Sequence, residues 1–151
     1  MTATRLSSIQ ADDQLGAGTL ERLAAAPALN KWMYTRLEPW LGQTVLEVGS
    51  GIGSISQFFV DREAVVLTDI EDAYLGYLKE RFGNQDTVRF VKMALPDVPD
   101  SLRSERFDSV VSVNVLEHIE KDLEALVAMR SLLSDEGNVV LLVPALEWLY
   151  G

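Results

Sequence analysis

Residues 45–53 contain the feature that most restricts the fold of this chain. They read Val-Leu-Glu-Val-Gly-Ser-Gly-Ile-Gly, an apolar run that ends in glycines at positions 49, 51 and 53. A strand that runs into alternating glycines brings its backbone unusually close to another group, because glycine has no Cβ. In an open α/β sheet that group is normally a nucleotide-like ligand at the carboxyl ends of the strands. We therefore expect a parallel sheet with a ligand site directly after this strand.

The rest of the chain alternates between strand and helix patterns. Apolar runs predict strands at 44–48, 64–69, 87–92, 107–113 and 138–143, and helical spacing predicts helices at about 29–41, 54–62, 71–82 and 116–134. Gly83 and Gly137 lie where helices commonly end. The stretch 93–106, with Pro96 and Pro99, is expected to be a loop with at most a short helical turn. Near-continuous apolar strands joined by helices predict one doubly wound α/β domain with a parallel sheet.

The first part of the chain differs in composition from the rest. Residues 1–18 are polar and small and are expected to form an arm, and the domain is expected to occupy 19–151. Thr19 is a candidate N-cap for a first helix that Pro27 interrupts. Since residues 1–18 hold no apolar core of signal-peptide length, a cytoplasmic location is expected.

Charge and cysteine content narrow the possible partners and chemistry. With 13 basic and 23 acidic side chains, the net charge of −10 disfavours binding to nucleic acids and membrane surfaces. The absence of cysteine excludes disulfides, thiolate catalysis and cysteine-ligated zinc. A small-molecule ligand is the expected partner.

Three positions discriminate among nucleotide-like ligands. The dinucleotide fingerprint needs a small residue such as Gly or Ala at position 54, where this chain has Ser54. Glu47, just ahead of the glycines, would repel a pyrophosphate but attract a ligand that carries an ammonium or a sulfonium group. Asp69, twenty residues after Gly49, ends the next strand and is placed to accept hydrogen bonds from a ribose diol. Together they favour an adenosine ligand with a cationic end.

The segment Glu47-x-Gly49-x-Gly51-x-Gly53 with Asp69 resembles the class I S-adenosylmethionine-dependent methyltransferases. The resemblance extends to Phe107-Asp108-Ser109-Val110-Val111 and Val115-Leu116-Glu117-His118-Ile119 and covers about residues 25–145. It implies a Rossmann-like sheet of five parallel strands in the order 3-2-1-4-5, with S-adenosyl-L-methionine as the cofactor. The last strands of the full methyltransferase fold are missing from this sequence.

The resemblance also implies which residues hold the cofactor. The glycine loop would lie against the methionine part and the ribose, Asp69 would hold the ribose hydroxyls, and Ile70 would lie against the adenine. Many relatives have an aspartate after the third strand where this chain has Met93, so a backbone amide of Met93 or Ala94 is the expected adenine contact. The full set of expected cofactor-binding residues is Glu47, Gly49, Ser50, Gly51, Gly53, Asp69, Ile70, Met93, Ala94, Asn114 and Trp32.

Each of these residues also has a plainer interpretation. The glycines could form a tight turn without a ligand, and Asp69 could cap the helix that follows it. Trp32 could simply belong to the core. Asp108 begins a strand, away from the expected ligand edge, so no catalytic role is expected for it.

His118, the only histidine, is the one candidate catalytic residue. It is a candidate general base for an acceptor hydroxyl, and packing near the cofactor without proton transfer is an equal alternative. Some RNA 2′-O-methyltransferases bind a divalent ion through a Glu-x-x-Glu-His pattern, which Asn114-x-x-Glu117-His118 resembles without its first acid. Since a second histidine is also lacking, a metal site is not expected.

The leading hypothesis is a methyltransferase that acts on a small molecule, such as a metabolite or a lipid- or sugar-linked intermediate. The alternatives are a non-catalytic module that binds the cofactor or dimerises, and, less favoured, an NAD-dependent oxidoreductase. Strand 138–143 would form an uncovered sheet edge, which either a longer protein or a second copy could close. Exposed apolar residues near the C-terminus fit both cases, and self-association is the expectation: Leu146, Trp148, Leu149 and Tyr150.

Overall fold

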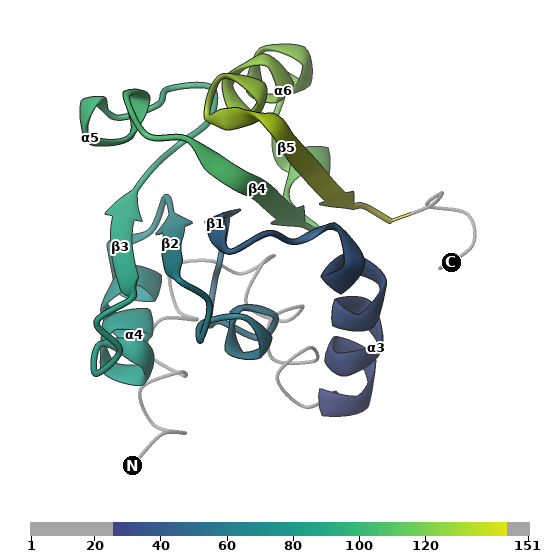
Figure 1. Ribbon diagram of the computed structural model, residues 1–151, viewed down its shortest axis with the longest axis vertical. Coiled ribbons are helices and arrows are strands. Elements are labelled where there is room, and N and C mark those ends of the chain that lie inside the picture. Colours follow the sequence, from purple (N-terminus) through teal and green to yellow (C-terminus); the bar gives the residue numbers. More distant parts are fainter. Residues whose placement is uncertain (1–25, 145–151) are drawn as a thin grey trace.

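The structure, a computed structural model, describes residues 26–144. Figure 1 shows a twisted five-stranded sheet with helices on both faces. The strands are β1 (Thr44–Val48), β2 (Ala64–Asp69), β3 (Val88–Lys92), β4 (Phe107–Val113) and β5 (Leu133–Leu142). The helices and 3-10 turns are α3 (Pro27–Leu37), η1 (Glu38–Trp40), η2 (Ser56–Phe58), α4 (Asp72–Phe82), α5 (Asp100–Arg103), η3 (Leu116–His118) and α6 (Asp122–Ser131).

The sheet has the predicted topology. Its order is β3-β2-β1-β4-β5, and every neighbouring pair is parallel. In the register of the central strand, Glu47 lies between Leu67 of β2 and Val111 of β4. Parallel neighbours require crossover connections, which the helices supply. The predicted doubly wound α/β fold is confirmed.

Two apolar clusters hold the helices against the two faces of the sheet. One face packs on α3, on the segment around η2 and on α4, all below the sheet in Figure 1. The other face packs on α5 and α6, which lie above it. The apolar side chains of the central strands alternate between these clusters, as both faces of a parallel sheet must be covered. The carboxyl ends of the strands therefore remain as the edge at which loops gather.

The helix predicted at 29–41 is present in two parts. Pro27 is the first residue of α3, where its fixed φ and missing N–H do no harm. The chain then tightens into η1, and Gly42 follows with its backbone N–H bonded to the Ser109 hydroxyl at 2.8 Å. The predicted arm at 1–18, most of the helix from Thr19 and the apolar residues 146–150 lie outside the described residues.

The helix predicted at 54–62 is wrong. Only the 3-10 turn η2 forms there. In an α-helix over 54–62 the Ser54 carbonyl would accept the Phe58 N–H. Instead the Phe58 N–H donates to the Ile55 carbonyl at 3.1 Å, and the Gln57 side chain donates to the Ser54 carbonyl at 2.6 Å. A side chain thus occupies a carbonyl that a regular helix would use, and Arg81 holds the preceding Ile52 carbonyl at 2.6 Å.

The long helix predicted at 116–134 is also wrong in extent. It is divided into η3 and α6, because Ile119 has an extended backbone (ψ 111°) and Lys121 a non-helical one (ψ 59°). At the other end α6 stops at Ser131, and β5 begins at Leu133 rather than at 138.

Gly137 was predicted to end a helix, and it lies inside β5 instead. The pairing of β4 with β5 is irregular between Phe107 and Ser109, and a Cβ on Gly137 would lie 2.8 Å from the Phe107 carbonyl oxygen. Close approach of two backbones is therefore the reason for glycine at this position. Gly83 does end α4, as predicted.

Asp108 lies at the amino edge of the sheet. Its carboxylate accepts backbone N–H groups of Gln43 and Thr44, both at 2.9 Å. These hydrogen bonds lower the pKa of Asp108 by stabilising its charged form. The residue therefore fastens the entry to β1, which agrees with the absence of an expected catalytic role. Among the described residues, no helix is long and apolar enough to cross a membrane.

Candidate cofactor site

The glycine turn after β1 has the backbone that its sequence predicts. Gly49, Gly51 and Gly53 have φ values of 69°, 52° and 74°, in the left-handed region that disfavours other residues. A Cβ on Gly49 would lie 2.5 Å from Cγ2 of Val115, which follows β4. A Cβ on Gly53 would lie 2.5 Å from the Phe82 ring of α4. The turn therefore requires glycine both for its backbone angles and for the space around it.

Backbone and side-chain bonds tie this turn to the end of β2. Ser50 N–H donates to the Thr68 carbonyl at 2.8 Å, and Gly51 N–H donates to Oδ2 of Asp69 at 2.8 Å. Oδ1 of Asp69 accepts the Glu71 N–H at 3.0 Å, just before α4 begins. Burial raises the pKa of Asp69, and the hydrogen bonds from Glu71 and Gly51 oppose that rise. Asp69 thus connects the glycine turn to the start of α4.

Glu47 lies beneath the glycine turn and is 3% exposed. The Ser56 hydroxyl donates to its carboxylate. Burial raises the pKa of Glu47 to about 7; the bond from Ser56 opposes the rise, and the nearby charge of Asp69 adds to it. Glu47 and Asp69 are therefore two buried acids at neighbouring strand ends, each harder to ionise than usual. A cationic group close to them would relieve that cost.

The expected adenine contacts lie after β2 and β3. The side chain of Ile70 is 56% exposed, although it is apolar. Met93 is buried, and its N–H donates to the Asp69 carbonyl at 3.1 Å, so this amide is already used within the sheet edge. Ala94 is exposed and forms an isolated antiparallel bridge with Asp97. Ile70 and Ala94 therefore present an exposed apolar side chain and an exposed backbone beside Asp69.

Asn114 has a strained backbone at the end of β4. Its φ of 54° makes it the one non-glycine residue with positive φ in the part of the chain that the structure describes. Its N–H donates to the Leu142 carbonyl at 2.8 Å, which continues the pairing of β4 with β5. Such outliers cluster at binding sites, where the surrounding structure maintains them. Asn114 is thus held at the same edge of the sheet as the glycine turn.

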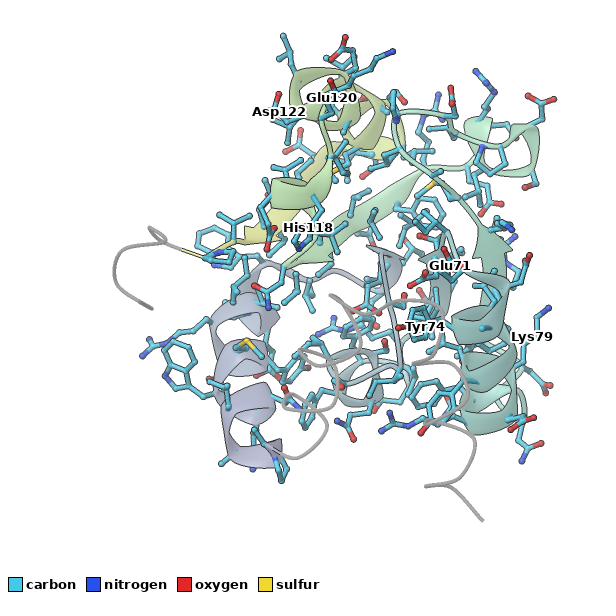
Figure 2. All side chains as sticks on the ribbon, turned by 180° about the vertical axis from the view of Figure 1, so that it is seen from behind. Glu71, Tyr74, Lys79, His118, Glu120 and Asp122 are labelled. Atoms are coloured by element: carbon cyan, nitrogen blue, oxygen red, sulfur yellow. The ribbon has the colours of Figure 1, made fainter. Side chains whose placement is uncertain are left out.

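His118 and Trp32 are both exposed. Figure 2 shows His118 on the segment between β4 and α6, and its side chain is 77% exposed, with Nε2 at 4.0 Å from Oε1 of Glu117. Both expectations for His118, a general base and a residue that packs near the cofactor, stay predictions. Trp32 is 53% exposed on α3, with the Arg36 guanidinium 5.6 Å from its ring centroid. The interpretation of Trp32 as a core residue is wrong.

The arrangement suits an adenosine ligand with a cationic end. The glycine turn has no Cβ at Gly49, Gly51 or Gly53, Gly49 is half-buried and the rest of the turn is buried, and two buried acids lie beside it. The Ser50 hydroxyl is buried beside Glu47, and its interaction with that carboxylate opposes the rise in the pKa of Glu47. Within residues 26–144, no cluster of three or more His, Asp or Glu side chains could hold a metal ion.

Four side chains that the sequence interpretation did not single out shape this site: Ser56, Gln57, Arg81 and Val115. Three of them lie in stretches predicted as regular helices, where a polar residue normally indicates only a solvent-facing position. Their partners are distant in sequence, such as Ile52 for Arg81 and Gly49 for Val115. Only the folded chain brings Arg81 and Val115 to the glycine turn.

Comparison with known proteins identifies related sequences. Residues 46–139, more than half of the chain, match the model of a family described as a methyltransferase domain. The highly reducing polyketide synthase pspA of Penicillium soppii is 28% identical over 119 residues, or 70% of this chain and 5% of that protein. The probable polyketide synthase 42 of Dictyostelium discoideum is 25% identical and covers 96% of this chain. The chain thus spans only 5% and 6% of the length of these curated relatives.

Solved structures share the fold. The trans-methyltransferase CalH, in complex with S-adenosylhomocysteine, has a TM-score of 0.67 at 20% identity, covering 90% of this chain and 41% of that one. The N-methyltransferase NodS of Bradyrhizobium japonicum WM9 has a TM-score of 0.65 at 18% identity, covering 74% of this chain and 60% of that one. At these identities the likeness shows the fold.

Adding one methyl group at Gly49 tests the geometry of the turn. Because Gly49→Ala combines a φ of 69° with a Cβ 2.5 Å from Val115, we expect a loss of about 2–4 kcal/mol in the free energy of unfolding. Urea denaturation measures it. In the control, Gly76→Ala, the new Cβ meets nothing within 4 Å on α4, so stability should stay equal or rise by up to about 1 kcal/mol. Equal stability of the two variants would contradict the described turn.

Proposed function

The chain belongs to the methyltransferase domain family, and we propose that it binds S-adenosylmethionine at the carboxyl ends of β1, β2 and β4 and transfers the methyl group to a small molecule. The observation that carries this proposal is the pair of buried acids, Glu47 and Asp69, beside a glycine turn with three positive φ angles. The predicted membership of a methyltransferase family is confirmed. The solved structures share the class I fold, and their complexes with S-adenosylhomocysteine support S-adenosylmethionine as the cofactor.

The proposed roles of the residues follow from their places in the structure. Backbone groups of Gly49, Ser50, Gly51 and Gly53 lie against the methionine part and the ribose. Asp69 accepts from the ribose hydroxyls with the lone pairs that its backbone bonds leave free. Ile70 and Ala94 contact the adenine, and the buried Met93 packs beneath them in the sheet edge. Asn114 borders the methionine part, and Trp32 reaches the cofactor from α3.

Glu47 acts on the cofactor through charge. Its carboxylate faces Ser56 beneath the turn, so the proposal assigns it attraction for the cationic end rather than a direct contact. The bound cofactor supplies a methyl group on a positively charged sulfur, ready for in-line displacement. The residues of the chain then need to orient the two reactants and exclude water. Because orientation and exclusion of water are sufficient, the site needs residues that position the cofactor but no catalytic triad.

His118 is the proposed general base for the acceptor. It follows β4, close in sequence to Asn114, and its exposed ring is free to accept a proton from an approaching hydroxyl, amine or activated carbon. The proteins of similar fold include carbon methyltransferases and N-methyltransferases. The acceptor is therefore a small molecule, such as a metabolite or a lipid- or sugar-linked intermediate, and either carbon or a heteroatom can receive the methyl group. The cytoplasmic location stays a prediction.

Titration calorimetry with three ligands and two variants tests the function. Wild-type protein should bind S-adenosylmethionine and S-adenosylhomocysteine but not NAD. Asp69→Asn should weaken both by about tenfold or more, since a charge-assisted bidentate contact with the ribose is lost. Asp72→Asn is the matched control, because that carboxylate is exposed and pairs with Lys92 at 2.6 Å.

The outcomes separate the hypotheses. Failure of wild-type protein to bind S-adenosylmethionine would overturn the proposed function, and binding of NAD instead would favour an oxidoreductase. Unchanged affinity in Asp69→Asn would show that the ribose lies elsewhere. Binding of the cofactor without turnover of any acceptor would identify a non-catalytic binding module.

The pKa of Glu47 predicts a pH dependence of cofactor affinity. Because Glu47 without ligand titrates near pH 7, its charged form should increase between pH 6 and 8 and strengthen the binding of S-adenosylmethionine. S-adenosylhomocysteine lacks the sulfonium charge, so its affinity should rise less. In Glu47→Gln the difference between the two slopes should vanish. Equal slopes for both ligands in wild-type protein would contradict an interaction between Glu47 and the sulfonium.

The same group predicts a pH dependence of stability with the opposite sign. A folded-state pKa above the ordinary 4.5 means that the stability due to protonated Glu47 is present below pH 4.5 and is lost as the pH rises through about 7. Glu47→Gln should therefore stabilise the ligand-free protein at pH 8 by up to about 3 kcal/mol and have little effect at pH 5. Thermal denaturation at both pH values measures this.

Self-association through β5 is a separate proposal. Among the described strands β5 pairs only with β4, and its outer edge borders a groove of about 450 Å³. Trp40 and Leu141, which line that groove, are 60% and 38% exposed. An apolar strand edge of this kind is suited to pairing with a second strand, and we propose a second copy of the chain. The groove is lined by Arg36, Leu37, Trp40, Asn138, Val139, Val140, Leu141 and Leu142.

Sedimentation velocity tests this proposal. Wild-type protein should dimerise at micromolar concentration, and Leu141→Lys should shift it to monomer, because a charge on an edge strand opposes pairing. Leu123→Lys on α6 is the control; that side chain is 67% exposed and lies outside the groove, so the dimer should persist. A wild-type protein that stays monomeric throughout would refute self-association.

A further inference from the structure

Arg81 on helix α4 forms hydrogen bonds to the glycine turn. The guanidinium of Arg81 donates to the Ile52 carbonyl at 2.6 Å and to Oε1 of Gln57 at 2.9 Å. Nε2 of Gln57 donates in turn to the Ser54 carbonyl at 2.6 Å. Arg81 and Gln57 therefore fasten the carbonyls on both sides of Gly53. We call this arrangement the Arg81 clasp.

Apolar contacts between Gly53 and helix α4 position the Arg81 clasp. Gly53 lies against Leu78 and Phe82, one turn and one residue away from Arg81 on α4. The Arg81 guanidinium also lies 4.9 Å from the centroid of the Phe82 ring, which restricts its side chain over that surface. The same helix begins directly after the segment in which Asp69 receives the N–H groups of Gly51 and Glu71. One rigid helix thus connects both halves of the candidate cofactor site.

The clasp replaces a helix that would otherwise hold the turn. After Gly53 only the 3-10 turn η2 forms, and the Phe58 N–H donates to Ile55 rather than to Ser54. Gly53 keeps backbone bonds on both sides, from its N–H to the Ser50 carbonyl at 2.8 Å and from the Gln57 N–H to its own carbonyl at 3.3 Å. The Ile52 and Ser54 carbonyls that flank it are held by side chains instead. A charge-assisted bond from Arg81 to a carbonyl is stronger than a neutral one and adds to the constraint on this turn.

We propose that Arg81 is a positioning residue for the cofactor: together with Gln57 it holds the glycine turn in the conformation that binds S-adenosylmethionine. This inference rests on the proposed function and adds a residue outside the contact set. Arg81 orders the turn before binding, so the ligand does not have to order it. Its removal should reduce affinity with only a small loss of overall stability, because the side chain is exposed and touches the first apolar cluster only through the ring of Phe82.

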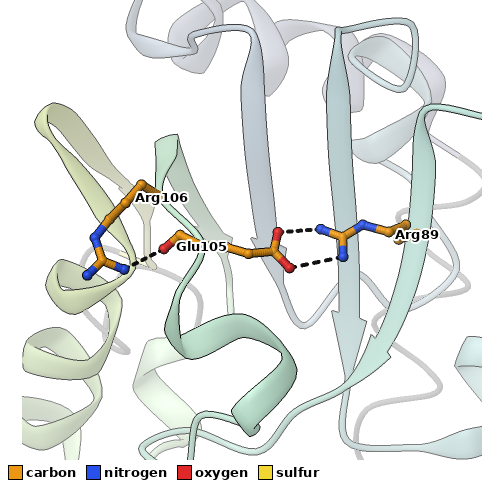
Figure 3. Close-up of polar contacts among 3 residues, drawn as sticks. All are labelled: Arg89, Glu105 and Arg106. Atoms are coloured by element: carbon orange, nitrogen blue, oxygen red, sulfur yellow. Dashed lines mark hydrogen bonds and ion pairs between the residues drawn. The ribbon is translucent and has the colours of Figure 1, made fainter.

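The ion pair between Arg89 and Glu105 is the matched control. Figure 3 shows this bidentate contact between β3 and the segment before β4, with Arg106 bonded to the Glu105 carbonyl. Like Arg81, Arg89 is an exposed arginine with two hydrogen bonds from its guanidinium, but none of its bonds reaches the glycine turn. Arg89→Ala therefore measures the effect of losing an exposed arginine elsewhere.

The first measurement is the dissociation constant of S-adenosylhomocysteine by titration calorimetry. Arg81→Ala should weaken binding by about five- to tenfold, as expected for the loss of a charge-assisted bond that orders the turn. Arg81→Lys should recover part of the loss, because lysine can reach one acceptor but not both. Gln57→Ala should resemble Arg81→Ala, and the double variant should be little worse than either. Arg89→Ala should stay within about twofold of wild type.

The second measurement is hydrogen exchange of the ligand-free protein. Arg81→Ala should speed exchange of amides in 52–58 while those of β5 stay unchanged, and Arg89→Ala should leave 52–58 as in wild type. This readout needs no ligand, so it tests the clasp even if S-adenosylmethionine fails to bind. Unchanged exchange in Arg81→Ala, or equal losses of affinity in Arg81→Ala and Arg89→Ala, would overturn the proposal.

Discussion

The rest of the site depends on the hydrogen bonds that join the turn after β1 to the end of β2. Ser50 N–H reaches the Thr68 carbonyl, and Gly51 N–H reaches the Asp69 carboxylate. These two bonds fix the flexible backbone of the glycine turn against the carboxyl edge of the parallel sheet. With them in place, Asp69 is oriented by its own partners, α4 starts at a defined point, and Glu47 is enclosed beneath the turn.

Two buried acids are costly to ionise, and binding of a cationic cofactor explains why a methyltransferase domain would keep them. Burial makes Glu47 and Asp69 resist ionisation, and their proximity increases the cost for Glu47. A cationic ligand reverses the balance, because its charge favours the ionised carboxyl groups. Stability of the empty protein and affinity for the cofactor are thus opposed at Glu47. Such opposition is common where binding needs a group that the fold alone would prefer to be neutral.

Local patterns predict the elements of this protein well where packing and pattern agree. Apolar runs locate β1, β2 and β4 to the residue, because buried parallel strands read as continuous apolar segments. The same reasoning fails at 54–62, where helical spacing is real but the Gln57 side chain takes the Ser54 carbonyl. It fails again at Gly137, since a glycine after a helix and a glycine at a close backbone contact look alike in sequence.

The sequence by itself determined the order of the candidate site residues: an acid near the end of β1, three glycines in the turn that follows, and a second acid at the end of the parallel strand β2. It therefore indicated an adenosine ligand with a cationic end, and the family match shows a methyltransferase domain. Tertiary structure alone decided that Glu47 faces Ser56, that Val115 closes over Gly49 and that Arg81 holds Ile52. The physical reason is that local spacing encodes backbone conformation, whereas these partners lie on separate elements that meet only after the sheet has formed.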